Sequence, residues 1–392
     1  MANARAADFE VAVVGAGPAG ATAARGLAAA GARVALIERA RLPRYKSCAG
    51  GIPLRTAALL PPGVDSVVED SVRGLNVSYL GRGRFTRWSR RPFALMVMRD
   101  RFDNFLAESA AEAGAEVLAG SPVSAVERDG AGFMLTVGGQ RLSSRFVIGA
   151  DGANSGVARA AGLGAGLAQS VALEAEVCGR PGDLDRWRGT VNIDFGYRPW
   201  GYGWVFPKQA RLSIGLVLPP GGGPDLRSHL QVYLGRLGLA DAEIERVVGH
   251  KLLFRRGREP IAGDGVLLAG DAAGLADEFT EEGIYYAVRS GGLAAQAVLR
   301  ALGAGQTSLV GYERAIDRLI MPELRAARRI AIMFYLSLRR ATRPMLWLSE
   351  RVSYFWNAFF RIQQGASSYD RELRRAFWLR PFLSLVDRAA LG

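Results

Sequence analysis

A glycine-rich run near the N-terminus carries the clearest chemical signal in the chain. Residues 15–20 read GAGPAG and lie between two short apolar runs, the second of which ends at Glu38. In a strand–turn–helix–strand unit of this kind, the first glycine makes the tight turn, the second admits a pyrophosphate to the backbone, and the third packs helix on strand. The spacing therefore predicts a dinucleotide site built on Gly15, Gly17 and Gly20, with Glu38 on the ribose hydroxyls.

Two later turns that combine glycine with aspartate favour a flavin dinucleotide. The stretch 267–274, LLAGDAAG, delivers Asp271 at the end of an apolar strand, and 149–155, GADGANS, is a second such turn. Ligands bind at the carboxyl ends of strands in open α/β sheets, so the Asp271 carboxylate is placed to accept hydrogen bonds from a ribityl hydroxyl. A helix then begins near Gly283 and Ile284, where N–H groups can stabilise negative charge on a reduced flavin ring. Because the sequence holds no second glycine fingerprint, these features predict FAD.

A cysteine lies in the stretch YKSCAGGIP at 45–53, in which two glycines leave room for a ligand to approach the backbone. Lys46 and nearby arginines can lower the pKa of the Cys48 thiol and make it reactive, but a thiol is also a common small apolar filler. Both interpretations stay open: a catalytic role, or packing beside the flavin. With only Cys48 and Cys178 in 392 residues, neither a disulfide framework nor a cysteine-based zinc site is expected, and no metal is predicted.

Aromatic residues alternate along the stretch 200–216, so that Trp200, Tyr202, Trp204 and Phe206 fall on one face of a predicted strand. They form either a half-buried core strand or the wall of an apolar ligand pocket, and we favour the wall. The Tyr202 hydroxyl is a further candidate catalytic group.

The elements expected around these residues define the fold class. The sequence predicts an α/β (α+β) protein: a Rossmann-type FAD-binding domain, an interleaved antiparallel β-sheet substrate domain and a C-terminal helical region. The expected boundaries are 8–75, 95–160 and 255–305 for the first, 76–94 and 161–254 for the second, and 306–392 for the third. The two histidines, His229 and His250, lie outside every motif and are expected on the surface or in loops.

Charge is concentrated at the C-terminal end. The net charge is +13, and fifteen arginines against seven acidic residues lie between Gly311 and Gly392. There they interleave with Phe, Trp and Leu in a helical pattern, which suits either an ordinary helical cap or an amphipathic surface that contacts an anionic membrane. No nucleic-acid recognition motif accompanies the charge. Without a signal peptide before Phe9 or an apolar run of membrane-spanning length, we expect a cytoplasmic protein peripheral to the cytoplasmic membrane.

Several motifs together resemble a known family. The N-terminal fingerprint, MRDRFDNFLAESA at 98–110, GADGANSGVAR and LLAGDAAG resemble the p-hydroxybenzoate-hydroxylase-type FAD fold. Within that fold, KSCAGGIP, GYGWVFPK and GDAAG followed by EGIYYAVRSG resemble the geranylgeranyl reductase family, over roughly residues 8–300. The resemblance implies an FAD-dependent oxidoreductase that saturates carbon–carbon double bonds of a polyprenyl chain on a lipid, quinone or pigment. It implies a reduced nicotinamide (NADPH or NADH) or reduced ferredoxin as the electron donor.

The resemblance also assigns residues to parts of the cofactor. It implies that Ala19 and the neighbouring glycines hold the pyrophosphate, that Glu38 holds the AMP ribose, and that Val123 meets the adenine through its backbone. Along the flavin, phosphate and ribityl parts it implies contacts from Cys48, Ala49, Gly51, Arg99, Asp271, Gly283 and Ile284. One departure stands out, because this chain has Glu281 where the family usually has glycine, with Asp277 and Glu278 in place of a proline region. If that glycine position needs a positive φ, Glu281 is strained there.

Other functions remain open on the sequence. The same fold serves FAD monooxygenases that hydroxylate or epoxidise hydrophobic or aromatic substrates with oxygen. Flavin-dependent halogenation is suggested faintly by the aromatic stretch, but it needs a lysine near the flavin tunnel, and the chain has only Lys46, Lys208 and Lys251. A protein that binds flavin without turnover is a further alternative. The oligomeric state is not indicated by the sequence.

Overall fold

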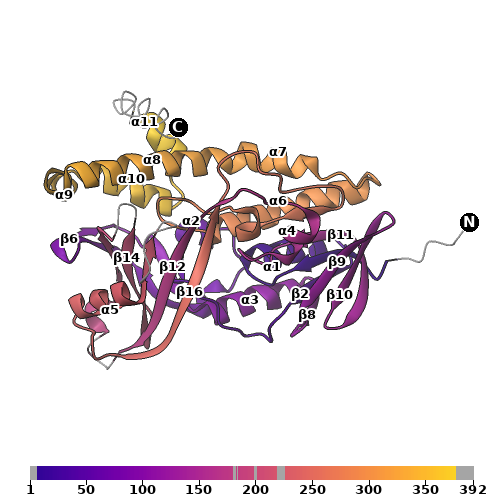
Figure 1. Cartoon of the computed structure of the whole chain (residues 1–392), viewed down its shortest axis with the longest axis horizontal. Coiled ribbons are helices and arrows are strands. Elements are labelled where there is room, and N and C mark those ends of the chain that lie inside the picture. Colours follow the sequence, from indigo (N-terminus) through magenta and orange to yellow (C-terminus); the bar gives the residue numbers. More distant parts are fainter. Residues whose placement is uncertain (1–6, 180–181, 183, 198–200, 219–225, 377–392) are drawn as a thin grey trace, which may run out of the picture.

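The computed structural model describes residues 7–179, 182, 184–197, 201–218 and 226–376. It contains a parallel sheet, a large second sheet, a small third sheet and a C-terminal layer of helices (Figure 1). The fold is the predicted mixed α/β class with a Rossmann-type sheet.

The first sheet carries the N-terminal fingerprint. Its strands run in the order β8-β2-β1-β11-β10-β9, and β17 pairs with β11. The pairings among β8, β2, β1, β11 and β17 are parallel, whereas β9, β10 and the first half of β11 form an antiparallel meander. The strands are β1 (Phe9–Val14), β2 (Val34–Glu38), β8 (Glu116–Ala119), β9 (Val123–Asp129), β10 (Gly132–Val137), β11 (Gln140–Gly149) and β17 (Val266–Leu268).

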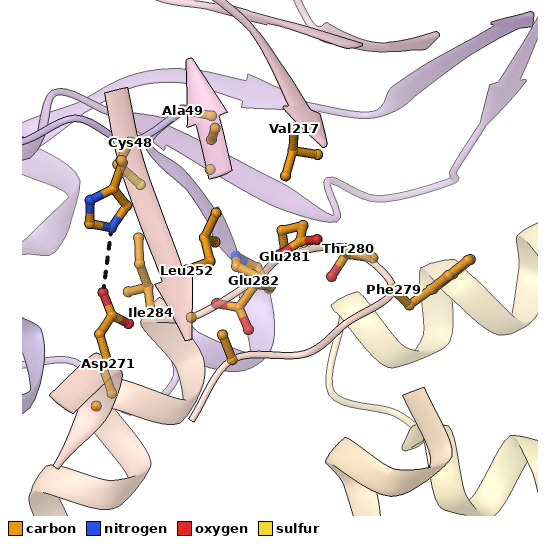
Figure 2. A pocket seen from close by; sticks show the side chains of 18 of the residues that line it. Cys48, Ala49, Val217, Leu252, Asp271, Phe279, Thr280, Glu281, Glu282 and Ile284 are labelled. Atoms are coloured by element: carbon orange, nitrogen blue, oxygen red, sulfur yellow. Dashed lines mark ion pairs between the residues drawn. The ribbon is translucent and has the colours of Figure 1, made fainter. Parts of the chain in front are cut away.

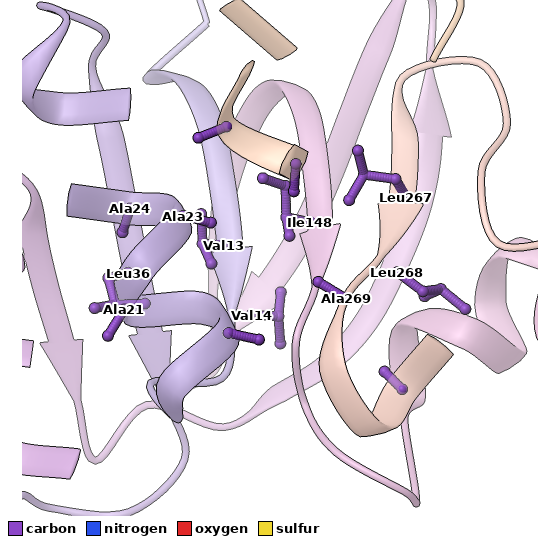
Figure 3. Close-up of a cluster of buried hydrophobic side chains, with 14 of the residues drawn as sticks. Val13, Val14, Ala21, Ala23, Ala24, Leu36, Ile148, Leu267, Leu268 and Ala269 are labelled. Carbon is purple, nitrogen blue, oxygen red and sulfur yellow. The ribbon is translucent and has the colours of Figure 1, made fainter. Parts of the chain in front are cut away.

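Helices cover this sheet and bury its central strands. Val11–Val14 and Val34–Ile37 are almost fully buried, as expected for parallel strands that are apolar on both faces. Figure 3 shows Val13, Val14 and Leu36 packed with Ala21, Ala23 and Ala24, and the core continues through Ile148, Leu267 and Leu268. The helices with this sheet are α1 (Pro18–Ala29), α3 (Arg99–Glu112), α4 (Gly156–Ala161), α6 (Ile284–Gly303) and α7 (Val310–Leu319), together with the 3-10 turn η3 (Gly270–Ala273).

The second sheet has the order β16-β12-β15-β14-β13-β5-β6. Its pairings are antiparallel except for one parallel pairing between β5 and β13. The strands are β5 (Gly74–Tyr79), β6 (Arg82–Trp88), β12 (Ala168–Cys178), β13 (Thr190–Phe195), β14 (Tyr202–Pro207), β15 (Arg211–Leu218) and β16 (Glu243–Phe254), with α5 (Leu226–Arg236) and η2 (Asp185–Trp187) beside them. The third sheet, ordered β3-β7-β4, comprises β3 (Gly51–Pro53), β7 (Ala94–Val97) and β4 (Val68–Val72), flanked by α2 (Leu54–Ala57) and η1 (Val64–Val67).

The C-terminal helices lie along one long side of the molecule (Figure 1). They are α8 (Met321–Arg340), α9 (Thr342–Arg351), α10 (Ser353–Gln363) and α11 (Tyr369–Arg375). Tyr335 and Leu338 of α8 and Phe360 of α10 share a buried cluster with β-strand residues of the second and third sheets. None of the described helices has the length and apolar character needed to cross a bilayer.

Candidate functional site

A single cavity of about 1800 Å³ runs through the centre of the molecule. One end is lined by the glycine fingerprint, its middle by the 45–51 loop and η3, and the other end by the second sheet and helices α8 to α11. The volume exceeds that of a typical small-molecule pocket, about 300–1,000 Å³. The space is therefore large enough for a dinucleotide and a second ligand together.

The fingerprint forms an open cradle at the first end of the cavity. Gly15 has a φ of +101°, and its N–H donates to the Ile37 carbonyl at 2.7 Å, which closes the tight turn. Gly17 lines the cavity, and a Cβ at this position would meet no atom within 4 Å. Helix α1 begins at the next residue, Pro18, so its N-terminal N–H groups open on this space. Gly20 packs against the Gly15 carbonyl instead of lining the cavity.

Glu38 ends β2 beside this cradle and organises it. Its carboxylate accepts hydrogen bonds from the Ala16 N–H at 3.1 Å and the Ala40 N–H at 3.2 Å. Arg44 bridges Glu38 and the fully buried Asp103, at 3.2 and 2.6 Å respectively. Asp103 also pairs with Arg99, whose Nε and Nη2 donate to its two oxygens at 2.8 and 2.9 Å. This chain of charges fixes both Glu38 and Arg99 at the cavity wall.

A buried lysine, Lys208, anchors the backbone of the cysteine loop, which is the 45–51 segment. Lys208 donates from Nζ to the Ala49 carbonyl at 2.5 Å, and the Gly50 N–H donates to Cys48 Sγ at 3.4 Å. Arg99 lies beside Cys48. Both cysteines are free thiols, as expected from their number. The loop therefore presents Cys48 and Ala49 at the cavity from a fixed backbone, as Figure 2 shows.

Two buried glutamates flank Lys208. Glu174 accepts from the hydroxyls of Ser47 at 3.0 Å and Ser213 at 3.1 Å. Burial and the neighbouring charge of Glu174 raise the pKa of Glu176 to about 8. Burial lowers the pKa of Lys208, while the charge of Glu176 opposes that shift. This group ties β12 and β15 to the cysteine loop.

His250 lies in the cavity wall, so the expectation that it is a surface or loop residue is wrong. It is half-buried on β16, and its Nε2 lies 3.7 Å from Asp271 Oδ2, the pair that the dashed line in Figure 2 marks. The same Nε2 lies 3.2 Å from Lys46 Nζ at the cavity wall. Burial alone would raise the pKa of Asp271, but the hydrogen bond with His250 and the charge of Lys46 outweigh it and hold the pKa below its usual value. Asp271 therefore stays ionised beside the cavity, able to accept hydrogen bonds.

The segment between η3 and α6 is strained and acidic. Glu281 adopts a φ of +58°, a left-handed conformation that strains a residue other than glycine. The sequence predicted this strain for the case that the position needs a positive φ. The backbone is pinned on both sides, because Glu281 N–H donates to the Asp277 carbonyl and Asp277 N–H to the Glu282 carbonyl. Tyr202 holds the same segment by donating its hydroxyl to the Thr280 carbonyl at 2.7 Å.

The predicted aromatic strand is β14. Tyr202, Trp204 and Phe206 line the cavity, whereas Val205 points into a separate core. Trp200 lies outside the described residues. Across the cavity, α8 and α10 contribute further aromatic side chains, among them Phe334, Trp356 and Phe359. The far chamber is therefore mostly apolar.

The structure brings most of the predicted site residues to this one cavity. The predicted residues that line it are Gly15, Gly17, Ala19, Glu38, Cys48, Ala49, Gly51, Arg99, Val123, Asp271, Gly283, Ile284, Tyr202, Trp204 and Phe206. Sequence reasoning assigned no site role to Arg44, Lys208 or His250. Lys208 ends the motif GYGWVFPK, which could have indicated it, whereas Arg44 and His250 lie outside the recognised motifs.

The residues present fit FAD. The open space over Gly17 suits a pyrophosphate, because only the missing Cβ leaves that room beside a helix N-terminus. Glu38 at the end of β2 and the ionised Asp271 offer acceptors for ribose and ribityl hydroxyls. Gly283 and Ile284 stand at the start of α6, where a helix N-terminus favours negative charge.

Comparisons with known proteins agree with this geometry. Residues 8–194 match the FAD binding domain family. The chain is 34% identical to a geranylgeranyl diphosphate reductase of Rhodobacter capsulatus, over 78% of this chain and 79% of that protein. It is 31% identical to a digeranylgeranylglycerophospholipid reductase of Methanocaldococcus jannaschii, over 78% and 81% of the two chains.

Solved structures give the same result for the fold. A geranylgeranyl bacteriochlorophyll reductase-like protein of Thermoplasma acidophilum superposes with a TM-score of 0.74 at 27% identity, covering 83% of this chain and 88% of that one. A flavin-dependent brominase variant superposes with a TM-score of 0.75 over 97% of this chain, but at 21% identity it shares the fold alone.

Proposed function

Because the chain belongs to the geranylgeranyl reductase family, we propose that it is an FAD-dependent oxidoreductase that saturates carbon–carbon double bonds of a polyprenyl chain carried on a lipid, quinone or pigment. The observation that carries the proposal is the single cavity, which joins the FAD cradle to a chamber walled by aromatic side chains. Such a chamber suits a long apolar chain, since apolar pockets bind apolar ligands and leave few polar groups unpaired.

When bound and reduced, FAD supplies hydride to one carbon of the double bond, and a proton completes the saturation. In our proposal the chain positions the cofactor as follows: Gly15, Gly17 and Ala19 at the pyrophosphate, Gly20 behind the turn, Glu38 at the AMP ribose, Val123 at the adenine, Arg99 and Asp271 at the phosphate and ribityl part, and Cys48, Ala49, Gly51, Gly283 and Ile284 along the ring. Tyr202, Trp204 and Phe206 pack against the isoprenoid chain and exclude water. Since the Tyr202 hydroxyl already donates to the Thr280 carbonyl, we assign it a positioning role for that segment.

The test is saturation of a defined lipid without air. Purified holoenzyme, reduced with dithionite, is incubated with geranylgeranyl-bearing lipids, and products are analysed by mass spectrometry. We expect a gain of two hydrogens for each double bond saturated. An FAD monooxygenase would instead need oxygen and add an oxygen atom, so oxygen-dependent hydroxylation or epoxidation with no anaerobic product would refute the proposal.

The electron donor is a separate proposal. We propose that a reduced nicotinamide or reduced ferredoxin reduces the bound flavin. Loss of the oxidised flavin absorbance is followed anaerobically with NADPH, NADH and ferredoxin in turn. A flavin that none of them reduces would support the binding-protein alternative.

Cys48 packs beside the flavin in our proposal and takes no part in proton or electron transfer. Its Sγ already accepts from the Gly50 N–H and contacts Arg99. We therefore expect Cys48→Ala and Cys48→Ser to keep the rate of double-bond reduction within about threefold of wild type, since the change removes a small half-buried group. Single-turnover rates of the pre-reduced enzyme check this, and a loss of more than about 100-fold in both variants would establish a chemical role.

We also propose that the C-terminal region contacts an anionic membrane around the mouth of the chamber. Trp347 and Leu348 on α9 are exposed, and Leu348 with Met345 also lines the cavity. Arg343 and Arg351 are exposed on the same helix. Exposed aromatic and aliphatic side chains among arginines at a pocket rim suit interfacial binding. A lipid substrate could then pass from the bilayer into the cavity.

A vesicle flotation assay tests this surface. The double variant Trp347→Ser/Leu348→Ser should bind phosphatidylglycerol-containing vesicles at least about tenfold more weakly than wild type, because two apolar anchors are lost. Val310→Ser on α7, an equally exposed apolar position, serves as the control and should bind normally. Unchanged binding by the double variant would rule out α9 as the contact surface.

A further inference from the structure

Saturation of an isolated double bond needs a proton donor, and one acidic side chain at the cavity is left without a structural role. Four acids lie between residues 277 and 282. Asp277 accepts at Oδ1 from the N–H groups of Phe279 and Thr280, and its Oδ2 accepts from the Thr280 hydroxyl. Both of its oxygens are therefore occupied by the turn that they stabilise.

Two of the other three acids are paired with arginines. Glu278 pairs with Arg256 and Arg328. Glu282 accepts from the Tyr285 N–H and lies 3.6 Å from Arg55. Each of these carboxylates therefore faces a cation, which favours its ionised form. For Glu282, burial opposes this effect and raises the pKa to about 7.

Glu281 differs from all three because neither a turn nor an arginine holds its carboxylate. It lines the cavity beside Ser170 of β12, and its Oε2, like that of Glu282, is buried with no hydrogen-bond partner among the described residues. No cation from the described part of the chain pairs with it. Figure 2 shows it next to Thr280 and below Val217. An ionised carboxylate in such surroundings is costly, whereas a neutral carboxylic acid is tolerated.

The titratable groups around Glu281 also favour its neutral form. Burial, then the charges of Asp277 and Glu278, raise the pKa of Glu281 well above its ordinary value, against the opposing hydrogen bond from Ser170. Tyr202 of β14 and Tyr335 of α8 also face it, and burial raises the pKa of both, so neither presents a charge. These neighbours therefore favour the neutral, protonated form of Glu281.

The backbone at Glu281 supports a role other than packing. A left-handed φ costs a non-glycine residue on the order of 1 kcal/mol or more, and such strain concentrates at functional sites. Hydrogen bonds on both sides hold the segment in this conformation, which keeps Glu281 at the cavity.

We propose that Glu281 is a catalytic acid that donates its carboxyl proton to the double bond, a role that rests on the proposed reductase function. In this step the π bond opens, one carbon takes hydride from the reduced cofactor, and the other takes the proton from Glu281. Two C–H bonds form, the cofactor is left oxidised, and Glu281 is left as a carboxylate that regains a proton from water.

Three variants and two measurements test the role. Glu281→Gln keeps the shape without the proton, and Glu281→Gly removes the acid and relieves the strain. Glu112→Gln, at the exposed end of α3, is the matched control outside this segment. In dithionite-reduced single turnovers, we expect both Glu281 variants to saturate the lipid about 10²–10⁴-fold more slowly, with wild-type flavin content, while Glu112→Gln stays near wild type. Infrared difference spectra of wild type minus Glu281→Gln at pH 7.5 should show the C=O stretch of a protonated carboxylic acid.

The outcomes separate this role from the reductase function itself. If wild type saturates the lipid and both Glu281 variants do so within threefold, Glu281 is not the acid. A missing carboxylic-acid band at pH 7.5 would also overturn the role, whatever the rates. If wild type saturates no polyprenyl lipid, the reductase function fails and the catalytic role fails with it. Because glycine relieves the strained φ, loss of folding in Glu281→Gln alone still leaves Glu281→Gly to decide.

Discussion

Gly17→Leu should yield a folded protein that does not hold FAD. A Cβ at Gly17 meets no atom within 4 Å, and its backbone is extended, with φ −81° and ψ −176°, so the protein itself accommodates a side chain. The leucine would instead fill the open cradle at the N-terminus of α1, where we place the pyrophosphate. We expect FAD affinity to fall at least about 100-fold, or roughly 2.7 kcal/mol.

Flavin absorbance per protein after purification and FAD titration of the apoprotein measure this effect. The melting temperature of the variant should match that of wild-type apoprotein within a few degrees. Gly15→Ala is the contrasting change, because its Cβ would lie 2.3 Å from the Ala150 carbonyl oxygen at a φ of +101°. It should lower the stability of the apoprotein itself. Full flavin content in Gly17→Leu would show that the pyrophosphate binds elsewhere.

Arg55→Met should destabilise the protein by about 3–5 kcal/mol. Arg55 is buried, lies 3.6 Å from Glu282 and 3.3 Å from Glu323, and stacks 4.1 Å above the Tyr285 ring. Methionine keeps much of the volume but leaves two buried carboxylates without their cation. Burial already raises the pKa of Glu282 to about 7 against the charge of Arg55, and without that charge its pKa should rise further.

Urea unfolding at pH 5 and pH 8 measures both the size and the sign of this effect. A carboxyl whose pKa is raised in the folded state takes up protons on folding, so stability falls as pH rises from its unfolded pKa toward its folded one. The loss in Arg55→Met should therefore be larger at pH 8 than at pH 5. Arg188→Met, which breaks an exposed pair with Asp185, is the control and should change stability by less than about 1 kcal/mol. Equal losses in the two variants would contradict a buried role for Arg55.

Local sequence patterns were sufficient to predict those site residues that lie within a single segment of the chain. The fingerprint around Gly15 and the strand end at Glu38 were predictable because a turn and its two flanking strands are neighbours in sequence. The alternation at Tyr202, Trp204 and Phe206 was predictable for the same reason, since period 2 is a property of one strand. The fold class followed from the order of these segments.

Long-range pairs were not predictable in this way. His250 reaches the cavity because β16 pairs with β12 along eleven positions, and no motif marks a strand register. Lys208 meets the Ala49 carbonyl through a contact between segments 159 residues apart. The preference of Glu281 for its neutral form depends on which of the acids have a cation beside them. The sequence does not show this, because Arg55 and Arg256 are far in sequence from the acids that they contact.

The position of β17 has a consequence for how the protein is made. This strand pairs with the end of β11, and Gly291 of α6 lies against Ala19 of α1 so closely that a Cβ would come within 2.3 Å of its carbonyl oxygen. The N-terminal cradle therefore lacks one wall until the ribosome has passed Gly291. At about 5–20 residues per second, that is a delay of roughly 10–60 s after the fingerprint emerges. Nascent chains that stop short of α6 should bind FAD poorly, which makes flavin loading a late event in biosynthesis.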